Sequence, residues 1–535
     1  MPAPAWPWWR GAVVYQVYVR SFCDSNGDGQ GDLPGVLSKL DYIAGLGVDA
    51  IWLSPIHPSP NRDWGYDVAD YDGVHPDYGS LADFDHLLQE AHARGLKVLL
   101  DEVLCHTSDE HPWFTDSQGC ANGKADWYVW ADPHKDGTVP NNWLSAFAGP
   151  AWAYKPARRQ YYHHKFLRQQ PKLNWRDGDA RAAALKVLDL WLARGADGFR
   201  LDVANAYLHD AGLRDNPPVP EDARTAYNWS HAPNLQEHWF DSNLEENVTA
   251  LDAIRRTVDA HKNRFVFGEF SEEAERSGCY LGPDQGLHSG YSFPMLLLRR
   301  LKPQFFRNHF AMLARHAAHW PCVSFSNHDV MRTVTRFGGS ETTPALARMM
   351  LALLFSLKGT ALLYQGEELG LPEADLRRDQ LRDPVGDLYY PESKGRDGCR
   401  TPMPWDGAAV NFGFTGGTPW LPVSPSHRGL AVTAQDWQAD STLNYARAFL
   451  KRRKASAALR LGEIAFAEAP EAVLAFTRAE GGETLLCLFN MGAKDVQVRD
   501  ARIAAANGFQ DVCRDAMASA GSVTLSGFGV WIGAI

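Results

Sequence analysis

The chain has 535 residues, of which 45% are hydrophobic and 22% charged, and its net charge is −11. This length exceeds one ordinary hydrophobic core, so we expect one large domain with smaller attachments. The composition excludes a disordered chain, and the negative charge argues against nucleic acid as a partner, because such binding needs clustered Lys and Arg.

Three features of the sequence bear on the cell compartment. The N-terminus, Met-Pro-Ala-Pro-Ala-Trp-Pro, lacks the basic start and apolar run of a secretory signal. The most apolar segment, 349–364, is interrupted by Lys358 and Gly359 and is short for a bilayer span. The eight cysteines form no Cys-x-x-Cys pair. We therefore expect reduced thiols, a cytoplasmic address and no membrane partner.

The first hundred residues alternate between strand and helix patterns. Alternation at this spacing indicates parallel crossover units. The patterns predict strands over 12–22, 48–53 and 96–104, and helices over about 35–46 and 81–93.

From His106 to about Leu173 this alternation stops, and a stretch rich in Trp, Tyr, Asn, Gly and Pro follows. A loop of this length in a compact domain indicates a functional insertion. A helix is then predicted over 181–194, and later strands end near 207, 270, 329 and 368, with a sixth strand near 290–295.

The fold class that we expect is a (β/α)8 barrel with an inserted subdomain after its third strand. Past about residue 459, short strand patterns joined by Gly-containing turns predict a small antiparallel β-sandwich. The predicted boundaries are 1–105 and 174–458 for the barrel, 106–173 for the insertion and 459–535 for the C-terminal domain.

The segment Asp197-Gly-Phe-Arg-Leu-Asp202 places Arg200 and Asp202 on one face of a strand, opposite an apolar face. Such charges need partners when buried, so they fit either a surface ion pair or the open end of a parallel barrel. Glu269 and Asp329 end two later strands. All three acids are farther apart in sequence than the roughly 30 residues of one βαβ unit, so each belongs to a different strand.

Strands that are distant in sequence converge at the mouth of a barrel, so we expect the three acids to meet there. Two facing carboxyl groups are what glycosidic cleavage requires. Glu269 stands between Phe267 and Phe270, and an apolar surround favours the protonated form that a general acid needs. Arg200 on the same face favours the ionised form of Asp202, as a nucleophile requires.

A set of short segments, in this order along the chain, carries a family resemblance: Asp101-Glu-Val-Leu-Cys-His106, Gln170-Pro-Lys-Leu-Asn174, Gly198-Phe-Arg-Leu-Asp202, Phe267-Gly-Glu269, Ser326-Asn-His-Asp329, Tyr364-Gln-Gly-Glu-Glu368 and Arg400-Thr-Pro-Met-Pro-Trp405. They resemble glycoside hydrolase family 13, the α-amylase family. Within that family they are most similar to exo-acting α-glucosidases related to oligo-1,6-glucosidase.

The resemblance implies a role for each matching residue. Asp202 is the expected nucleophile, Glu269 the acid/base and Asp329 a stabiliser of the distorted sugar. The residues implied to bind the glucose are Asp63, Tyr66, His106, Arg200, His328 and Arg400. Arg400 is the expected partner of Asp63, and this pair would close the pocket beyond the terminal glucose. Phe147 and Phe166 are either aromatic walls of the pocket or packing residues of the insertion.

The implied reaction is double displacement with retention of the α-configuration. The leading hypothesis is an α-glucosidase that acts on short α-glucosides such as maltose, isomaltose or sucrose, with some transfer to other sugars and no organic cofactor. The alternatives are a transglucosylase or sucrose-using isomerase of the same architecture, and a non-catalytic interaction protein on the same scaffold.

The segment from Asp24 to Asp32 places oxygen-bearing side chains at alternate positions, with glycines that permit a tight wrap. Hard oxygen ligands suit Ca²⁺, or Mg²⁺ with retained waters. The resemblance implies a structural metal here, with the carbonyl of Gln30 contributing; a polar turn without metal is the alternative. The expected ligands are Asp24, Asn26, Asp28, Gln30 and Asp32.

Three positions depart from the family pattern or bear on linkage. Cys105 stands where many amylases have an Asn that binds a further calcium, so no second metal site is predicted. Lys172 replaces the usual Asp of its segment, which leaves the contacts there open. Val203 resembles the residue associated with α-1,6 preference, and it leaves the linkage undecided.

Overall fold

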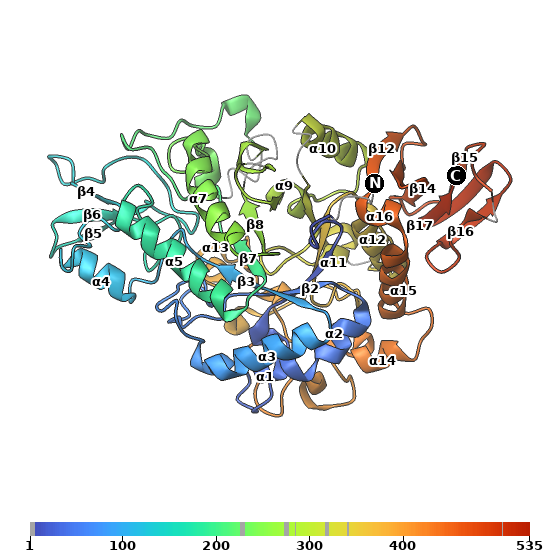
Figure 1. The fold of residues 1–535 in the computed structure, drawn as a ribbon, viewed down its shortest axis with the longest axis horizontal. Helices are drawn as coiled ribbons and strands as arrows, with labels where there is room; N and C mark the ends of the chain where they lie inside the picture. Colours follow the sequence, from blue (N-terminus) through green and yellow to red (C-terminus); the bar gives the residue numbers. More distant parts are fainter. Residues whose placement is uncertain are drawn as a thin grey trace.

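The computed structural model describes residues 6–224, 231–271, 278–283, 285–315, 320–339, 342–504 and 507–535. At its centre is an eight-stranded parallel sheet in the order β10-β11-β1-β2-β3-β7-β8-β9 (Figure 1). Its strands are β1 Val13–Val17, β2 Ala50–Leu53, β3 Lys97–Glu102, β7 Gly198–Leu201, β8 Phe265–Phe270, β9 Ser289–Ser292, β10 Cys322–Ser324 and β11 Thr360–Tyr364.

The two end strands, β9 and β10, approach each other. The described residues form no hydrogen-bonded ladder between them. The predicted barrel is therefore confirmed, with one seam that side chains rather than backbone hydrogen bonds close.

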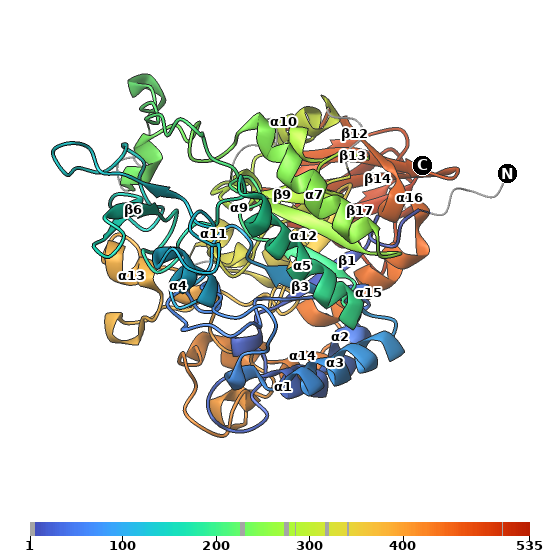
Figure 2. The ribbon, with the colours of Figure 1, turned by 60° about the vertical axis from the view of Figure 1, so that its left-hand side comes forward.

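Helices lie on the outside of these strands, as α3, α5 and α7 do in Figure 2. The described helices of the barrel and its connections are α1 Leu33–Ser38, α2 Leu40–Leu46, α3 Leu81–Ala93, α5 Gly178–Arg194, α7 Val248–Asp259, α9 Phe293–Leu296, α10 Pro303–Arg315, α11 Thr333–Gly338, α12 Pro344–Ser356, α13 Pro384–Tyr389, α14 Val432–Asp436, α15 Thr442–Ala455 and α16 Ala457–Leu461. Within the described ranges, none of them is both long and apolar enough to cross a bilayer.

Local sequence signals explain where these helices start and stop. Asp177 caps the start of helix α5, because its side chain accepts hydrogen bonds from the first backbone N–H groups, and Gly195, in the left-handed conformation, caps its end. The single helix predicted over 35–46 is wrong. Lys39 leaves helical geometry with φ −110° and ψ 8°, so the segment divides into α1 and α2.

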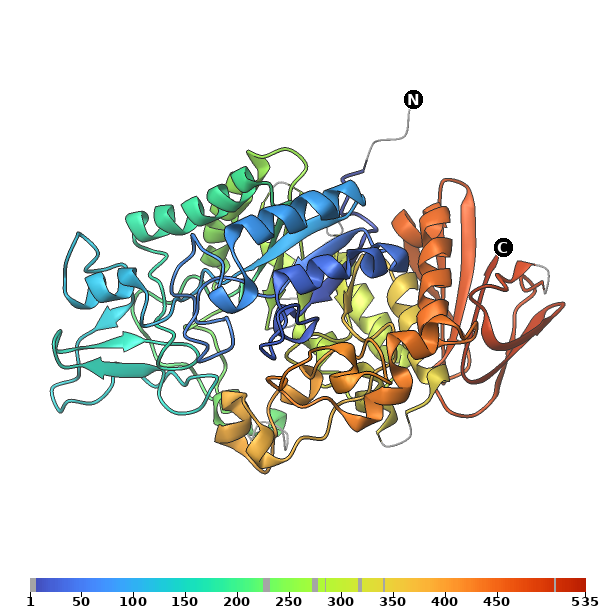
Figure 3. The ribbon, with the colours of Figure 1, turned by 90° about the horizontal axis from the view of Figure 1, so that it is seen from below.

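The predicted insertion contains α4 Pro112–Gln118 and a three-stranded antiparallel sheet of β4 Trp130–Ala131, β6 Gln160–His163 and β5 Trp152–Lys155. A small core of its own, which includes Trp143 and Trp152, holds this sheet together. The insertion lies on the opposite side of the barrel from the C-terminal domain (Figure 3).

The C-terminal domain is antiparallel, as predicted. Hydrogen bonds join its strands into one six-stranded sheet in which β17 pairs with β14 near its end and with β15 and β16 near its start. The strands are β12 Glu463–Ala467, β13 Val473–Glu480, β14 Glu483–Asn490, β15 Val496–Arg499, β16 Arg514–Ser519 and β17 Ser522–Ala534.

Candidate active site

Strand register brings the charged side chains of the barrel together. Arg200 on β7 lies opposite Asp101 on β3, and Glu269 on β8 lies opposite Tyr291 on β9. The first residue of β7, Gly198, has φ 147°, and a Cβ there would lie 1.7 Å from the carbonyl oxygen of Phe265. Only glycine fits this approach of β7 to β8, so it helps to set the positions of Arg200 and Glu269.

One buried guanidinium joins three carboxyl groups at this end of the barrel. Nη1 of Arg200 donates to Oδ1 of Asp101 at 2.7 Å and to Oδ1 of Asp202 at 2.9 Å. Nη2 contacts Oε1 of Glu269. The expected nucleophile and the expected acid/base therefore lie within the span of a single guanidinium group, although they come from different strands.

Val203, directly after Asp202, has a left-handed backbone with φ 45°. This conformation is unusual for a β-branched residue and stores strain. Its N–H group lies 3.5 Å from Oε2 of Glu269, so the strained turn adjoins both acids.

Burial raises the pKa of Asp202 to about 7 and that of Glu269 to about 7, although Arg200 acts to lower both. The prediction for Glu269 agrees with this direction. Arg200 acts on Asp202 in the expected direction, favouring its ionised form, but the cost of burying the charge outweighs the ion pair and the net pKa is raised. Two such carboxyl groups repel each other when both are ionised, so the pair is suited to hold one shared proton near neutral pH.

Asp329 has the opposite electrostatics. Burial alone would raise its pKa, but the contact with the His328 ring at 3.3 Å and the charges of Arg396 and Arg400 outweigh this effect and hold the pKa well below its usual value. Burial lowers the pKa of His328, so its ring is neutral at neutral pH. The positive charge beside Asp329 therefore comes from the two arginines, and Asp329 is ionised.

The predicted pair of Asp63 with Arg400 is wrong, and Arg396 takes that place. Nη2 of Arg396 donates to Oδ1 of Asp63 at 2.7 Å, and Nη1 donates to Oδ1 of Asp329 at 3.1 Å. Arg396 is also held by both oxygens of the buried Asp383.

Arg400 follows a 3-10 turn over Asp397–Cys399. It is fully buried and donates to the carbonyl of His328 at 2.7 Å and to Asp329 at 2.9 Å. Arg396 comes before that turn and therefore reaches the side where Asp63 lies. Sequence reasoning missed Arg396 and Asp383. A second arginine four positions before Arg400, in a Gly-containing turn, was the available signal.

Residues from the loop after β2 and from the start of the insertion form a second layer around the acids. Tyr66 donates to Oδ2 of Asp101 at 3.0 Å and stacks on His328 with ring centroids 5.2 Å apart. Nε2 of His106 lies 2.9 Å from the carbonyl oxygen of Tyr66. Gln170, which was not among the predicted residues, donates to Oδ2 of Asp63 at 3.1 Å.

Phe147 and Phe166 of the insertion adjoin this cluster. The ring of Phe166 lies 5.3 Å from that of His106, and the two phenylalanines are 5.8 Å apart. The guanidinium of Arg396 lies 5.5 Å from the ring of Phe147. The insertion therefore brings both aromatic side chains beside the predicted glucose-binding residues.

Two departures from the family pattern, Cys105 and Lys172, contact each other. The side chain of Lys172 is fully buried, contacts the carbonyl of Ala206 and lies 3.6 Å from the sulfur of Cys105. Burial lowers the pKa of this lysine. An amino group thus occupies the space between the insertion and the loop that follows Asp202.

The predicted metal loop lies between β1 and α1, on a different connection from the three acids. Its backbone N–H groups donate to its own side chains in successive turns, from Asn26 to Asp24 at 2.9 Å, from Asp28 to Asn26 at 2.9 Å and from Gln30 to Asp28 at 2.8 Å. The described residues contain no group of three His, Cys, Asp or Glu side chains placed to hold a metal ion. The loop fits a metal only if amide and backbone carbonyl oxygens complete the shell, as they do for Ca²⁺.

Comparison with known proteins identifies the family. The alpha amylase catalytic domain matches residues 16–462. A probable alpha-glucosidase of Rhizobium meliloti is 48% identical over 90% of this chain and 89% of its own length. An oligo-1,6-glucosidase of Halalkalibacterium halodurans is 36% identical over 90% of each chain.

Solved structures agree. An alpha-glucosyl transfer enzyme superposes with a TM-score of 0.96 at 47% identity, covering 99% of this chain and all of its own. The trehalulose synthase of Pseudomonas mesoacidophila gives 0.89 at 30% identity over 99% of this chain and all of its own. The fold is that of a glycoside hydrolase. The chain belongs to the α-amylase family, glycoside hydrolase family 13.

Proposed function

We propose that the protein is a retaining α-glucosidase that releases glucose from the non-reducing end of short α-glucosides. The observation that carries this proposal is the placement of Asp202 and Glu269 on one buried guanidinium, with pKa values raised to about 7. Two carboxyl groups that share a proton can act as attacking group and acid in the same step.

In the first step the ionised Asp202 attacks the anomeric carbon while Glu269 gives its proton to the glycosidic oxygen, and the aglycone leaves as an alcohol. A β-glucosyl ester on Asp202 results. In the second step Glu269, now ionised, takes a proton from water as the water oxygen attacks the same carbon and the ester bond breaks. Two inversions leave the product in the α-configuration.

The contacts of Arg396 support release of one glucose at a time. Its guanidinium spans Asp63 and Asp329, and Gln170 holds the other oxygen of Asp63. Asp329 is ionised, so it can accept hydrogen bonds from sugar hydroxyls that strengthen as the ring distorts. We propose that this bridge closes the site beyond the terminal glucose.

Transfer of glucose to another sugar is the second candidate activity. A structure named as an alpha-glucosyl transfer enzyme is 47% identical, and the trehalulose synthase, a variant of which was crystallised with its substrate sucrose, is 30% identical. Both outcomes use the same acids and differ in whether water or a hydroxyl group accepts the glucose. The third hypothesis, a non-catalytic scaffold, has no support in a chain that retains all three acids.

Product analysis tests the proposal and ranks the candidates. The enzyme is incubated with maltose, isomaltose and sucrose, and the products are followed by NMR from the first minutes. α-Glucose as the first-formed anomer supports retention, and β-glucose as the first-formed anomer contradicts it. New disaccharides or trisaccharides that increase with sugar concentration indicate transfer, and an isomer of sucrose indicates the isomerase.

We further propose that the loop from Asp24 to Asp32 binds Ca²⁺, or Mg²⁺ with retained waters, as a structural ion. The ligands would be the side chains of Asp24, Asn26, Asp28 and Asp32 with the carbonyl oxygen of Gln30. A chelator is expected to lower the melting temperature, and added calcium to restore it. Elemental analysis of dialysed protein that finds no divalent metal would contradict this proposal.

We also propose a cytoplasmic location. All eight cysteines are free thiols. Unpaired thiols are typical of a reducing compartment. Fractionation of the native cells, with antibody detection, tests the location.

A further inference from the structure

Tyr291 connects the acid/base candidate to the central arginine. Strand β9 pairs with β8 so that Tyr291 lies opposite Glu269. The tyrosine hydroxyl donates to Oε1 of Glu269 at 2.9 Å. The same hydroxyl oxygen accepts from Nε and Nη2 of Arg200, at 3.3 and 3.2 Å.

The direction of these hydrogen bonds is fixed by chemistry. A guanidinium has donors and no acceptor, so the tyrosine oxygen must accept from Arg200. The single hydroxyl proton of Tyr291 is then available for Glu269. Oε1 of Glu269 therefore receives a proton donor from Tyr291 as well as the contact with Nη2 of Arg200.

The second oxygen of Glu269 has a different environment. The contact found for Oε2 within the described residues is the N–H group of Val203, at 3.5 Å. An oxygen that already accepts from two donors is a poor place for an acidic proton, because that proton would point at them. The acidic proton of Glu269 therefore belongs on Oε2.

We propose that Tyr291 is a positioning residue that fixes Oε1 of Glu269 as an acceptor and so makes Oε2 the atom that moves the catalytic proton. This inference rests on the proposed function. In the first step the O–H bond at Oε2 breaks and its proton joins the glycosidic oxygen as that oxygen leaves carbon. In the second step a proton of water returns to Oε2 as the water oxygen replaces Asp202 on the anomeric carbon.

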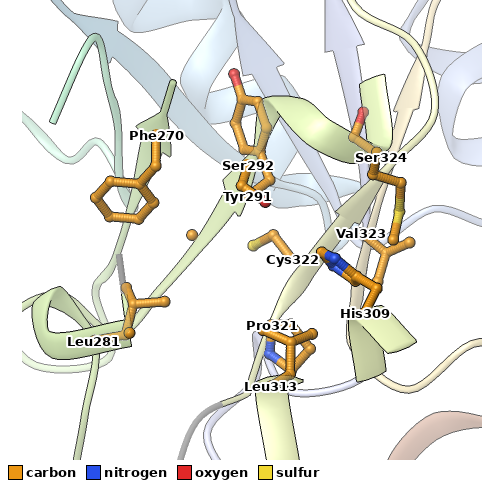
Figure 4. A pocket seen from close by; sticks show the side chains of 13 residues that line it. Phe270, Leu281, Tyr291, Ser292, His309, Leu313, Pro321, Cys322, Val323 and Ser324 are labelled. Carbon is orange, nitrogen blue, oxygen red and sulfur yellow. The ribbon is translucent and has the colours of Figure 1, made fainter. Parts of the chain in front are cut away.

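Apolar side chains lie around the ring of Tyr291. The residue lines a small cavity of about 20 Å³ at the seam between β9 and β10. Figure 4 shows the hydroxyl pointing away from Leu281 and Leu313, which form the apolar side of this cavity. The ring packs near Trp52 and Phe267, with centroids 6.3 Å away in each case. A phenylalanine ring would keep these contacts, so Tyr291→Phe removes the hydroxyl alone.

The substitution Tyr291→Phe should shift the pKa of Glu269 in a definite direction. The charged groups that face Glu269 are Arg200 and Asp202 at the end of β7, Asp101 on β3 and Asp329 after β10. The Tyr291 hydroxyl adds a hydrogen bond that favours the ionised carboxylate and so lowers the pKa of Glu269. Removing it raises that pKa. Because the first step needs protonated Glu269, the alkaline limb of the pH profile should move to higher pH.

The test compares Tyr291→Phe with Tyr15→Phe. Tyr15 on β1 is also fully buried and donates to a buried carboxylate, Glu368, at 2.7 Å. Glu368 lies outside the cluster of the three acids. kcat/KM is measured against pH with a disaccharide that the wild type cleaves and with 4-nitrophenyl α-glucoside, whose leaving group needs little protonation.

For Tyr291→Phe we expect about a tenfold or larger loss on the disaccharide, the size of one lost hydrogen bond to a charged group. We expect a clearly smaller loss on the aryl glucoside and an alkaline limb at higher pH. Tyr15→Phe should change neither the limb nor the ratio of the two rates. That ratio does not depend on the folded fraction, so a poorly folding variant still decides the matter.

Equal losses on both substrates with an unmoved alkaline limb would overturn the role of Tyr291. A wild-type enzyme that cleaves neither substrate would instead overturn the proposed function. The two failures are therefore distinguishable.

Discussion

The two ends of strand β7 place charge in opposite ways. Asp197, just before the strand, is a buried carboxylate held by several donors. Nε2 of His92 lies 2.6 Å from one oxygen, and Nζ of Lys97 and Nη1 of Arg264 lie 3.0 and 3.1 Å from the other. The backbone N–H of Val98 adds a fourth contact at 3.0 Å. Here one acid is surrounded by basic groups.

At the other end of β7 one arginine faces several acids. Arg200 contacts Asp101, Asp202 and Glu269. Burial raises the pKa of Asp101 to about 6 and the pKa values of Asp202 and Glu269 to about 7. The amino end is therefore organised for stability. At the carboxyl end, three acids share the positive charge of one arginine, so their charges are only partly balanced. This difference agrees with the general division of a parallel barrel, in which the carboxyl end carries function.

Replacing an acid at the carboxyl end should have the largest effect. Asp202→Asn removes the attacking group, and Glu269→Gln removes the proton donor. We expect each to lower kcat/KM on disaccharides by at least about a thousandfold. The circular dichroism spectrum should be unchanged. The exposed Asp85→Asn is the control, and near wild-type activity in either site variant would refute the assignment.

Replacing Arg396 tests the bridge that sequence reasoning misassigned. Lys cannot contact Asp63, Asp329 and Asp383 at once, because it lacks the planar fork of donors. We expect Arg396→Lys to lower kcat/KM about 10- to 100-fold, chiefly by raising KM. The exposed Arg377→Lys, which loses a pair with Asp379, should leave both constants unchanged. An unchanged KM in Arg396→Lys would contradict the closure of the site.

Replacing Asp197 should reverse the pattern and affect stability alone. Asn keeps the volume but leaves the basic groups without their shared carboxylate. These groups are partly exposed, so we expect a loss of about 1–3 kcal/mol in the free energy of unfolding, less than for a fully buried pair. kcat at a temperature where the variant is folded should match the wild type. A pH profile displaced in this variant would show that the two ends are coupled.

Glu269→Gln should stabilise the protein at alkaline pH. The pKa of Glu269 is raised from 4.5 to about 7 in the folded state, so the folded state binds more protons than the unfolded state between those values. Stability is therefore lost as pH rises through this window. A neutral amide avoids the loss, which is on the order of 3 kcal/mol.

The check is thermal unfolding at pH 4 and pH 8. The variant should melt above the wild type at pH 8, and the difference should be much smaller at pH 4. A wild type that is the more stable protein at pH 8 would contradict the account. Asp197→Asn, in contrast, should melt below the wild type.

The sequence predicts those parts of the site that lie on strands. Period-two alternation placed Arg200 and Asp202 on one face. The convergence of barrel strands at one mouth predicted that Glu269 lies beside them. The contacts of the long loops were not predictable in this way. Arg396 and Arg400 differ only in their side of a short turn, and no periodicity reports which one reaches Asp63. The strain at Val203 and the division between α1 and α2 likewise depend on tertiary packing.

The most direct test of the central claim is to trap the covalent intermediate. The enzyme is treated with a fluorinated α-glucosyl substrate that forms the ester quickly and hydrolyses it slowly, and is then digested and analysed by mass spectrometry. We expect one fluoroglucosyl group, attached to Asp202. A group on a different residue, or complete turnover with β-glucose as the first product and no adduct, would contradict the claim.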